Sequence, residues 1–430
     1  MRIKGFELKK LDRRLVEAAA LLLALAALAV LGFWYDSTRS NPVHGPETAS
    51  MLSVTSSADQ GPGSLREALF LAATADVRTT IVVEVDRVEI TTPLPPLVSP
   101  HGIGLVAGPR SHAEIDAQAL GSGPVFDVNG QNSSIEGLTI RNCPAAGVLL
   151  RASRFRMAAT NIEACDVGVD VAANAADVAL EQNRFARNRV GVRLAASIPN
   201  ALVSGNRFAG HTDAGLWAVH SEPDLRNIGT IVRDNQFGED RMGVVAGNLS
   251  MVVEENTFLD TRETAIHVIG EGLAVRANRI SGTAAMGIVA ENTRGVVIER
   301  NEIDGSSAYG IMVRGAANAL VRANLIHNCA YGMAFVLGDG RNPSTAVDNS
   351  IVAPQYRGID VIGDSPILRH NRVQQAGKSP LHVEGVQHPD GSVAKAEPFR
   401  DGNSFDERDA AVAATPSDST PAATVRPLAP

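Results

Sequence analysis

One short pattern recurs between Val125 and Glu384 at nearly constant spacing: an asparagine, any residue, then Phe, Ile or Val. Nine occurrences keep this spacing, at Asn183, Asn206, Asn235, Asn256, Asn278, Asn301, Asn324, Asn349 and Asn371, in steps of 23, 29, 21, 22, 23, 23, 25 and 22 residues. Ile140 and Ile162 extend the apolar series backward, with Leu138 and Thr160 in the asparagine slot. A fixed period in the twenties predicts a solenoid, in which each repeat packs only on its neighbours.

A second series runs in phase with the first. In most repeats a glycine precedes a short alternating apolar run, and in one repeat Ala265 takes its place. The glycines are Gly147, Gly168, Gly191, Gly215, Gly243, Gly287, Gly310, Gly332 and Gly358. Each repeat then holds about three short strands rich in Val and Ile, separated by Gly, Asn and Asp turns. No repeat has a ten-residue helical period, which excludes helical arrays. The leucine-rich pattern and the hexapeptide period of left-handed β-helices are also missing.

These repeats predict an all-β fold, a right-handed parallel β-helix of about 11–12 coils, with adjacent coils about 4.8 Å apart. Stacking of like residues would place Phe on Phe for four coils and then Ile on Ile. Buried asparagines would tolerate the left-handed turn conformation and pass side-chain hydrogen bonds from coil to coil.

The stretch before the repeats predicts a cap and the first, irregular coils. Ser64-Leu65-Arg66-Glu67 forms a capping box that would start a helix over 65–74. The apolar residues of that helix, Leu65, Ala68, Leu69 and Leu71–Ala73, would cover the open first coil, whose end strands otherwise expose unpaired backbone. Strands are expected at Thr80–Glu84, Val88–Ile90, Gly104–Val106 and Glu114–Asp116.

The repeats over roughly residues 51–386 resemble the pectin-lyase-like, parallel β-helix repeat superfamily, and the segment from Gly61 to Leu69 resembles the capping segment that opens many bacterial β-helices. The resemblance is closest to its periplasmic carbohydrate-binding and sugar-hydrolysis type of domain. It implies a β-helix whose glycine-led sheet forms a groove for a polysaccharide. It does not imply one activity, because the superfamily includes lyases, hydrolases, epimerases, adhesins and inert scaffolds.

Composition shifts divide the chain into five expected segments. Residues 1–14 are basic and would stay in the cytoplasm, and residues 15–35 are apolar, end in Phe33-Trp34-Tyr35, and are long enough to cross a bilayer as a helix. Residues 36–50 are a tether, 51–386 the capped β-helix, and 387–430 a tail expected to be disordered. The length of the apolar run favours an uncleaved anchor over a cleaved signal peptide. We therefore expect a single-pass protein of the inner membrane with its β-helix in the periplasm.

Cys143 and Cys165 lie three residues after the apolar position of adjacent coils. They are within disulfide reach, and either a bridge or two stacked thiols fits this spacing. Cys329 occupies the same turn without a partner in its neighbouring coils. The net charge of −8 and the absence of a basic footprint argue against nucleic acid as a partner. No cofactor and no metal site are expected.

Counting alternation from each glycine gives the side chains that point outward on the glycine-led sheet. One column contains Leu149, Asp170, Arg193, Trp217, Val245, His267, Val289, Met312, Ala334, Asp360 and His382, and a second contains Arg151, Glu291, Arg314 and Glu384. Longer connections at 220–229 and 338–345, the latter with Arg341, border this face.

A uronate lyase or epimerase needs a cation to neutralise the sugar carboxylate, a base to take the C5 proton, and an acid. We assign the catalytic roles to His267 as base, Arg314 as neutralising group and Glu291 as their acidic neighbour. Substrate contacts are expected from Trp217, Arg193, Met312, Arg341 and Asp360. The alternative for each of these side chains is that it has no functional role and is an ordinary solvated residue of a β surface.

Several family signatures of catalysis are missing. The chain lacks the Asp cluster that holds Ca²⁺ in pectate lyases, the Asp-Pro-His of alginate epimerases, and the paired aspartates and Gly-His-Gly of polygalacturonases. Two hypotheses follow. The protein binds, and modifies by lyase or epimerase chemistry, an exported acidic polysaccharide that contains uronate; alternatively, it is a non-catalytic scaffold that holds envelope proteins.

Overall fold

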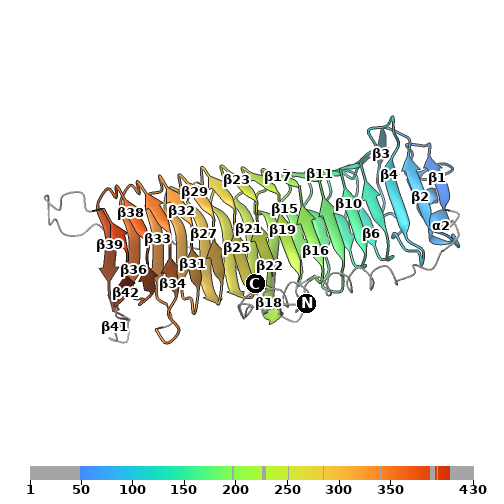
Figure 1. Cartoon of the computed structure of the whole chain (residues 1–430). Helices are drawn as coiled ribbons and strands as arrows, with labels where there is room; N and C mark the ends of the chain where they lie inside the picture. Colours follow the sequence, from blue (N-terminus) through green and yellow to red (C-terminus); the bar gives the residue numbers. More distant parts are fainter. Residues whose placement is uncertain are drawn as a thin grey trace, which may run out of the picture. The chain divides into compact units, whose positions relative to one another are not determined.

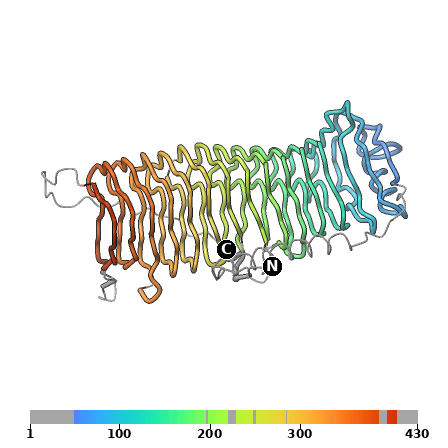
Figure 2. The backbone as a smooth tube through the Cα atoms, in the orientation of Figure 1, coloured from blue at the N-terminus to red at the C-terminus, as the bar shows by residue number. Residues whose placement is uncertain are grey.

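The structure is a computed structural model that describes residues 49–195, 198–224, 229–249, 251–283, 285–338, 340–387, 393–394 and 396–406. Three parallel sheets run along the stacked coils, and each regular coil between β6 and β39 contributes one strand to each sheet, whereas the first and last coils lack a strand in at least one of them (Figure 1). The described chain thus winds as the β-helix that the repeats predict (Figure 2). It has more coils than the 11 or 12 expected, because the sheets contain 15, 14 and 12 strands.

Sheet A begins beside the cap and contains 15 strands. In spatial order they are β1 (Ser50–Val54), β2 (Thr79–Val83), β4 (Ile103–Ala107), β7 (Ser134–Glu136), β10 (Phe155–Ala158), β13 (Val178–Glu181), β16 (Ala201–Ser204), β19 (Thr230–Arg233), β22 (Met251–Glu254), β25 (Leu273–Arg276), β28 (Val297–Glu299), β31 (Leu320–Arg322), β34 (Thr345–Val347), β37 (Ile367–Arg369) and β42 (Phe399–Asp401).

Sheet B contains the apolar residues of the asparagine pattern. Its 14 strands are β3 (Arg87–Glu89), β5 (Glu114–Asp116), β8 (Thr139–Arg141), β11 (Asn161–Glu163), β14 (Arg184–Ala186), β17 (Arg207–Ala209), β20 (Gln236–Gly238), β23 (Thr257–Leu259), β26 (Arg279–Ser281), β29 (Glu302–Asp304), β32 (Leu325–His327), β35 (Ser350–Val352), β38 (Arg372–Gln374) and β43 (Ser404–Phe405).

Sheet C is the glycine-led sheet. Its 12 strands are β6 (Phe126–Val128), β9 (Ala146–Leu150), β12 (Val167–Val171), β15 (Val190–Leu194), β18 (Ala214–Asp224), β21 (Met242–Leu249), β24 (Thr264–Glu271), β27 (Met286–Arg294), β30 (Tyr309–Arg314), β33 (Tyr331–Val336), β36 (Arg357–Ile362) and β39 (Ser379–Glu384). A separate antiparallel pair joins β40 (Val386–Gln387) and β41 (Val393–Ala394).

The phenylalanines of the repeat form one column, as predicted. The rings of Phe185, Phe208, Phe237 and Phe258 stack in sequence with centroids 4.9, 4.6 and 4.8 Å apart. All four are buried, and Phe258 pairs in register with Ile280, where the isoleucine column begins. Side chains that repeat at coil spacing therefore form the continuous core of the solenoid.

The asparagine column also forms, and one detail differs from expectation. The side-chain oxygen of Asn256 accepts hydrogen bonds from the backbone N–H and the amide of Asn235, at 3.0 Å each. The left-handed conformation lies one residue before the asparagine, for example at Glu255 (φ 55°) and Ala277 (φ 54°). The asparagine instead supplies the hydrogen bonds that hold this turn against its neighbours.

The column continues past the ninth asparagine. Asn403 accepts from the backbone N–H of Asn371 at 2.9 Å, and Phe405 pairs with Val373. The described β-helix therefore runs to Phe405 and not to residue 386. Asn403 and Phe405 carry the same Asn-x-Phe signal, but they stand 32 residues after Asn371, outside the regular spacing.

The series of glycines follows from the close approach of successive coils. A Cβ atom on Gly191 would lie 2.4 Å from the carbonyl oxygen of Gly215 in the next coil and 2.8 Å from the Phe208 ring. Any side chain at Gly191 would displace either the phenylalanine column or the neighbouring strand of sheet C.

The N-terminal cap forms largely as predicted, over α2 (Leu65–Ala73). The Ser64 side chain accepts from the backbone N–H of Glu67, and the Glu67 carboxylate accepts from the Gly63 N–H at 2.6 Å. Leu65 and Leu69 are buried against the first coil. Leu71, expected to help cover the coil, is instead 52% exposed because it lies on the outer side of the helix.

Cys143 and Cys165 form a disulfide, with Cα atoms 4.3 Å apart, which decides between the two states that the sequence left open. Cys329 is a buried free thiol. The predicted basic segment, anchor and most of the tether lie outside the described residues. Among the helices that are described, none has the length and apolar character needed to cross a bilayer.

Candidate functional site

Strand register places the predicted outward column of sheet C in one line. Leu149, Asp170, Arg193 and Trp217 are cross-strand partners in successive coils, and the line continues to Val245 and beyond, through His267, Val289, Met312, Ala334 and Asp360 to His382. The alternation counted from the glycines is therefore correct in register. Several of these side chains are nevertheless buried on the outer face.

The three residues assigned to catalysis come together in adjacent coils. Glu291 of β27 is the direct cross-strand partner of Arg314 of β30. Its Oε2 lies 3.3 Å from Nε2 of His267 of β24, and its Oε1 lies 3.8 Å from a guanidinium nitrogen of Arg314. The carboxylate thus bridges an imidazole and a cation on the outer face of sheet C. We call this set the Glu291 cluster.

Exposure rises steadily across the Glu291 cluster. The side chains of His267, Glu291 and Arg314 are 5%, 20% and 40% exposed. His267 therefore lies beneath the carboxylate, and its Nε2 has no hydrogen-bond partner of good geometry in the described chain. This placement makes Glu291, and not His267, the basic group that a ligand would reach first.

The surroundings keep Glu291 ionised. Its contact with the His267 imidazole lowers the pKa of the carboxyl below its ordinary value, and the nearby Arg314 guanidinium acts in the same direction. Partial burial opposes these two effects without overcoming them. Glu291 is therefore ionised at neutral pH and can accept a proton, but its lowered pKa makes it a weaker base than an ordinary glutamate.

Arg314 keeps most of its hydrogen-bonding capacity. Its contact with Glu291 at 3.8 Å exceeds hydrogen-bond length, and the described residues supply it with no closer partner. Arg193, by contrast, donates from Nε to Asp170 at 2.8 Å and from a second nitrogen to the other carboxylate oxygen. The guanidinium of Arg314 is thus better placed than that of Arg193 to bind an external carboxylate.

Asp360 forms a second polar group three coils further on. The hydroxyl of Tyr309 donates to its Oδ2 at 3.0 Å, and Arg357 lies 3.4 Å from its Oδ1. The residue is 1% exposed, and burial raises the pKa of its carboxyl despite the opposing charge of Arg357. The sequence assigned Asp360 to substrate binding, but it did not identify Tyr309 or Arg357 as its partners.

The two acids cannot act on one glycosidic bond. Three coil steps at about 4.8 Å separate their strands by roughly 14 Å. The paired carboxyls of glycosidases lie about 5 to 9.5 Å apart. A raised pKa at Asp360 and a lowered pKa at Glu291 therefore do not make an acid and base pair of the glycosidase type.

Asp360 provides a pH-dependent test of the fold. Below the ordinary aspartate pKa it is protonated in both states and contributes nothing. As pH rises, the unfolded chain ionises first, so wild-type stability falls until the raised folded pKa is reached. We expect Asp360→Asn to remove this loss and to exceed wild type in stability at pH 7, by about 1.4 kcal/mol for each unit of pKa elevation. Urea unfolding of both proteins at pH 4 and pH 7 measures this gain in stability. An equal difference in free energy of unfolding between variant and wild type at the two pH values would contradict the prediction.

Apolar side chains close part of the same face. Met312 packs with Val289, Tyr309 and Ala334 in a buried cluster, so it contributes to packing and is not open to a ligand. The rings of Tyr309, Tyr331 and Tyr356 lie against one another in a row, tilted by 30° and 32°, with centroids 4.8 and 5.2 Å apart. Each ring therefore covers part of its neighbour's face.

Trp217 and Arg341 complete the predicted site residues. Trp217 is half-buried and contacts two apolar clusters, one with Leu149 and Val190 and the other with Val245. It lies two coils before His267 in the same column. Arg341 lies in the connection between β33 and β34, outside sheet C. The structure therefore groups the three catalytic candidates, spreads four of the five binding candidates along sheet C, and places Arg341 outside it.

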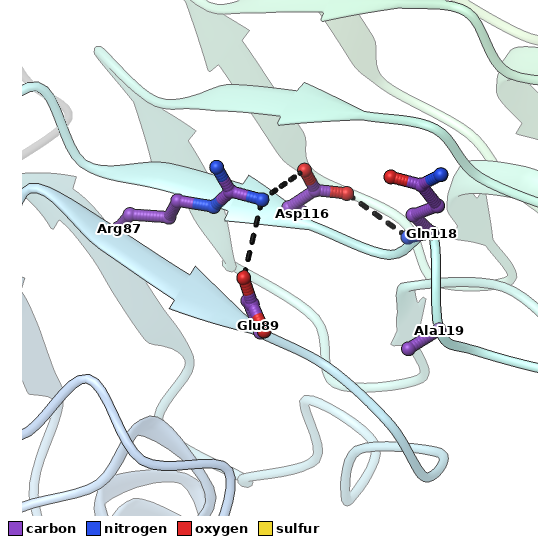
Figure 3. Close-up of a pocket in the computed structure, with 5 residues that line it drawn as sticks. All are labelled: Arg87, Glu89, Asp116, Gln118 and Ala119. Atoms are coloured by element: carbon purple, nitrogen blue, oxygen red, sulfur yellow. Dashed lines mark hydrogen bonds and ion pairs between the residues drawn. The ribbon is translucent and has the colours of Figure 1, made fainter.

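Two further polar groups lie elsewhere. His211 and Asp240 contact each other at 2.6 Å, but both side chains are 0% exposed inside the coils, which makes them core residues. A pocket of about 230 Å³ opens at the early coils of sheet B, where Arg87 contacts Glu89 and Asp116 at 3.2 and 2.8 Å (Figure 3). Among the described residues that line it, Arg87 is the one cation, and it is already paired with these acids.

Comparison with known proteins gives a fold relationship. The family model described as "Right handed beta helix region" matches residues 79–237 and 225–374, and no curated protein matches the chain in sequence. Similar solved structures include the catalytic unit of a thermostable GH87 α-1,3-glucanase from Streptomyces thermodiastaticus, at 13% identity and a TM-score of 0.54, covering 83% of this chain and 69% of that one.

Two other similar structures have a TM-score of 0.51. One is the A-module of the mannuronan C-5 epimerase AlgE6 of Azotobacter vinelandii, at 13% identity over 83% of this chain and 100% of that one. The other is a GH87 α-1,3-glucanase catalytic domain in complex with tetrasaccharides, at 14% identity over 83% and 69%. The predicted pectin-lyase-like resemblance is confirmed at the level of fold, and the chain belongs to the right-handed β-helix family.

Proposed function

We propose that the protein binds an exported acidic polysaccharide along the outer face of sheet C and removes a proton from one of its uronate units. The observation that carries this proposal is the Glu291 carboxylate, held between buried His267 and partly exposed Arg314. The similarity to β-helix structures of a glucanase and an epimerase supports a carbohydrate ligand, since both act on polysaccharides by name. The predicted N-terminal anchor would place this face in the periplasm.

Each member of the cluster has a separate role in this chemistry. Arg314 pairs with the sugar carboxylate and stabilises the negative charge that grows there as the C5 proton leaves. Glu291 accepts the proton, and His267 positions Glu291 from below. Return of a proton from water to the opposite face of C5 completes an epimerisation. Departure of the O4 substituent, which takes a proton from water, instead leaves a C4–C5 double bond and completes a β-elimination.

The length of sheet C suits a polymer better than a single sugar. Trp217 and Arg193 lie two and three coils before His267, roughly 10 and 14 Å along the axis. Sugar units on either side of the reacting one would therefore contact these residues.

Replacing the proposed base tests the proposal. Full-length protein in detergent is incubated in D₂O with a uronate polymer, and NMR follows deuterium at C5 while ultraviolet absorbance follows unsaturated uronate. We expect deuterium incorporation by wild type and a loss of about 10²- to 10⁴-fold in Glu291→Gln, the range for removal of a general base. Glu302→Gln is the matched control, because Glu302 pairs with Arg279 on sheet B. Equal rates in the two variants would refute the assignment.

A non-catalytic scaffold is the second candidate. It is favoured by the burial of His267, Met312 and Asp360, which leaves few reactive groups open on the face. Binding of the polymer without exchange at C5 would support a binding role alone. Failure to bind any uronate polymer would favour a scaffold that holds envelope proteins.

A further inference from the structure

The first coil carries an unusual share of exposed apolar side chains. Met51 in β1 is 71% exposed, and Phe70 and Leu71 in α2 are 60% and 52% exposed. Seven large hydrophobic residues are exposed in the described chain, and the other four lie at Val98, Leu259, Leu325 and Phe399. Three of the seven thus gather at one end of the β-helix, on two elements that pack together. We call these three residues the cap patch.

The cap patch does not serve the cap itself. Leu65, Ala68, Leu69 and Ala72 form the buried side of α2 and already cover the first coil. Burying a residue such as Phe or Leu stabilises by about 1.5–3 kcal/mol, and Phe70 and Leu71 forgo most of that by facing outward. Exposed apolar patches of this kind commonly mark a contact surface.

The charges of α2 are held within the cap. Arg66 contacts Asp59 at 2.7 Å and donates to the backbone oxygens of Thr92 and Pro93. Glu67 accepts from the Gly63 N–H at 2.6 Å. The outer side of the helix therefore offers apolar contact, and Glu67 is the one exposed charged residue of α2.

The sequence before the described residues indicates what covers this patch. The apolar run of residues 15–35 is followed by residues 36–49, a connection of 14 residues that ends next to β1. Fourteen residues reach at most about 50 Å even when fully extended. If residues 15–35 cross a bilayer, the first coil is the part of the β-helix held nearest to the lipid surface.

We propose that the cap end of the β-helix rests on the anchoring bilayer, with Met51, Phe70 and Leu71 at the boundary between lipid headgroups and acyl chains. Apolar side chains of surface elements insert to about this depth in interfacial proteins. The inference extends the proposed membrane anchoring by naming the surface that faces the lipid. In this orientation β6 is the strand of sheet C nearest the lipid and β39 the farthest, so a polymer that leaves the membrane would run along the sheet.

Fluorescence quenching by brominated lipid tests this orientation. Full-length protein in which Trp34 and Trp217 are replaced by Phe receives one tryptophan, either by Phe70→Trp or, as matched control, by Phe399→Trp. Phe399 is 54% exposed in β42, in the last described coil. Both variants are reconstituted in phosphatidylcholine vesicles with or without bromine on the acyl chains. We expect bromine to reduce the emission at least twofold at position 70 and not at position 399.

The other outcomes overturn the inference. Equal quenching at both positions would mean that the β-helix lies flat, and no quenching at position 70 would mean that the cap does not touch lipid. A blue-shifted but unquenched emission there would instead indicate a second copy docked on the patch. If the protein does not float with the vesicles, residues 15–35 do not anchor it, and the inference fails with them. None of these results alters the comparison of Glu291→Gln with Glu302→Gln, so the two proposals fail separately.

Discussion

Asn256→Ala will destabilise the β-helix by about 2–9 kcal/mol, because it leaves two or three buried polar groups without partners at about 1–3 kcal/mol each. Asn256 is 1% exposed and accepts from both the backbone and the side chain of Asn235. Its own amide donates to the Val232 oxygen at 2.9 Å and to Asn278 at 3.1 Å. Alanine cannot replace any of these four bonds.

Urea unfolding followed by circular dichroism measures this loss, and hydrogen exchange of the neighbouring coils locates it. Exchange is needed because coils of a solenoid can open without global unfolding. Asn161→Ala is the control, since Asn161 is only half-buried on sheet B and accepts a single side-chain bond, from Arg184 at 3.3 Å. If the two variants unfold at the same urea concentration, the asparagine column does not hold the coils together.

Phe237→Ala will cost about 3–5 kcal/mol, the range for removal of a buried aromatic side chain. Phe237 lies between Phe208 and Phe258, at centroid distances of 4.6 and 4.8 Å, so its loss opens a cavity and breaks the stack on both sides. Backbone hydrogen bonds between coils limit how far the walls of that cavity can collapse.

The same unfolding experiment, with Leu259→Ala as control, tests this prediction. Leu259 lies on the neighbouring strand of sheet B but is 48% exposed, so its truncation removes little buried area. A loss below about 1 kcal/mol at Phe237 would mean that the stack contributes little beyond what the remaining apolar column supplies.

Much of the candidate site followed from counting alone. Alternation from the glycines placed His267 and Asp360 in one column and Glu291 and Arg314 in another, and the register agrees. Counting did not reveal that His267 lies under Glu291, or that Tyr309 reaches across two coils to Asp360. Tyr309 and Tyr331 each precede a ladder glycine, which is a signal that sequence reasoning could have used.

Repetition explains what the sequence determined by itself. A solenoid repeats one local geometry, so the Asn, Phe and Gly periods specified its coils, its core and the turn that brings Cys143 to Cys165. The tertiary structure decided the features that no period encodes. These are the extension to Phe405 across an irregular step, the burial of His267 and Asp360, and the outward turn of Phe70 and Leu71. Burial and ion pairing depend on which side chains of neighbouring coils cover and contact one another. The spacing of residues along the chain does not specify these contacts.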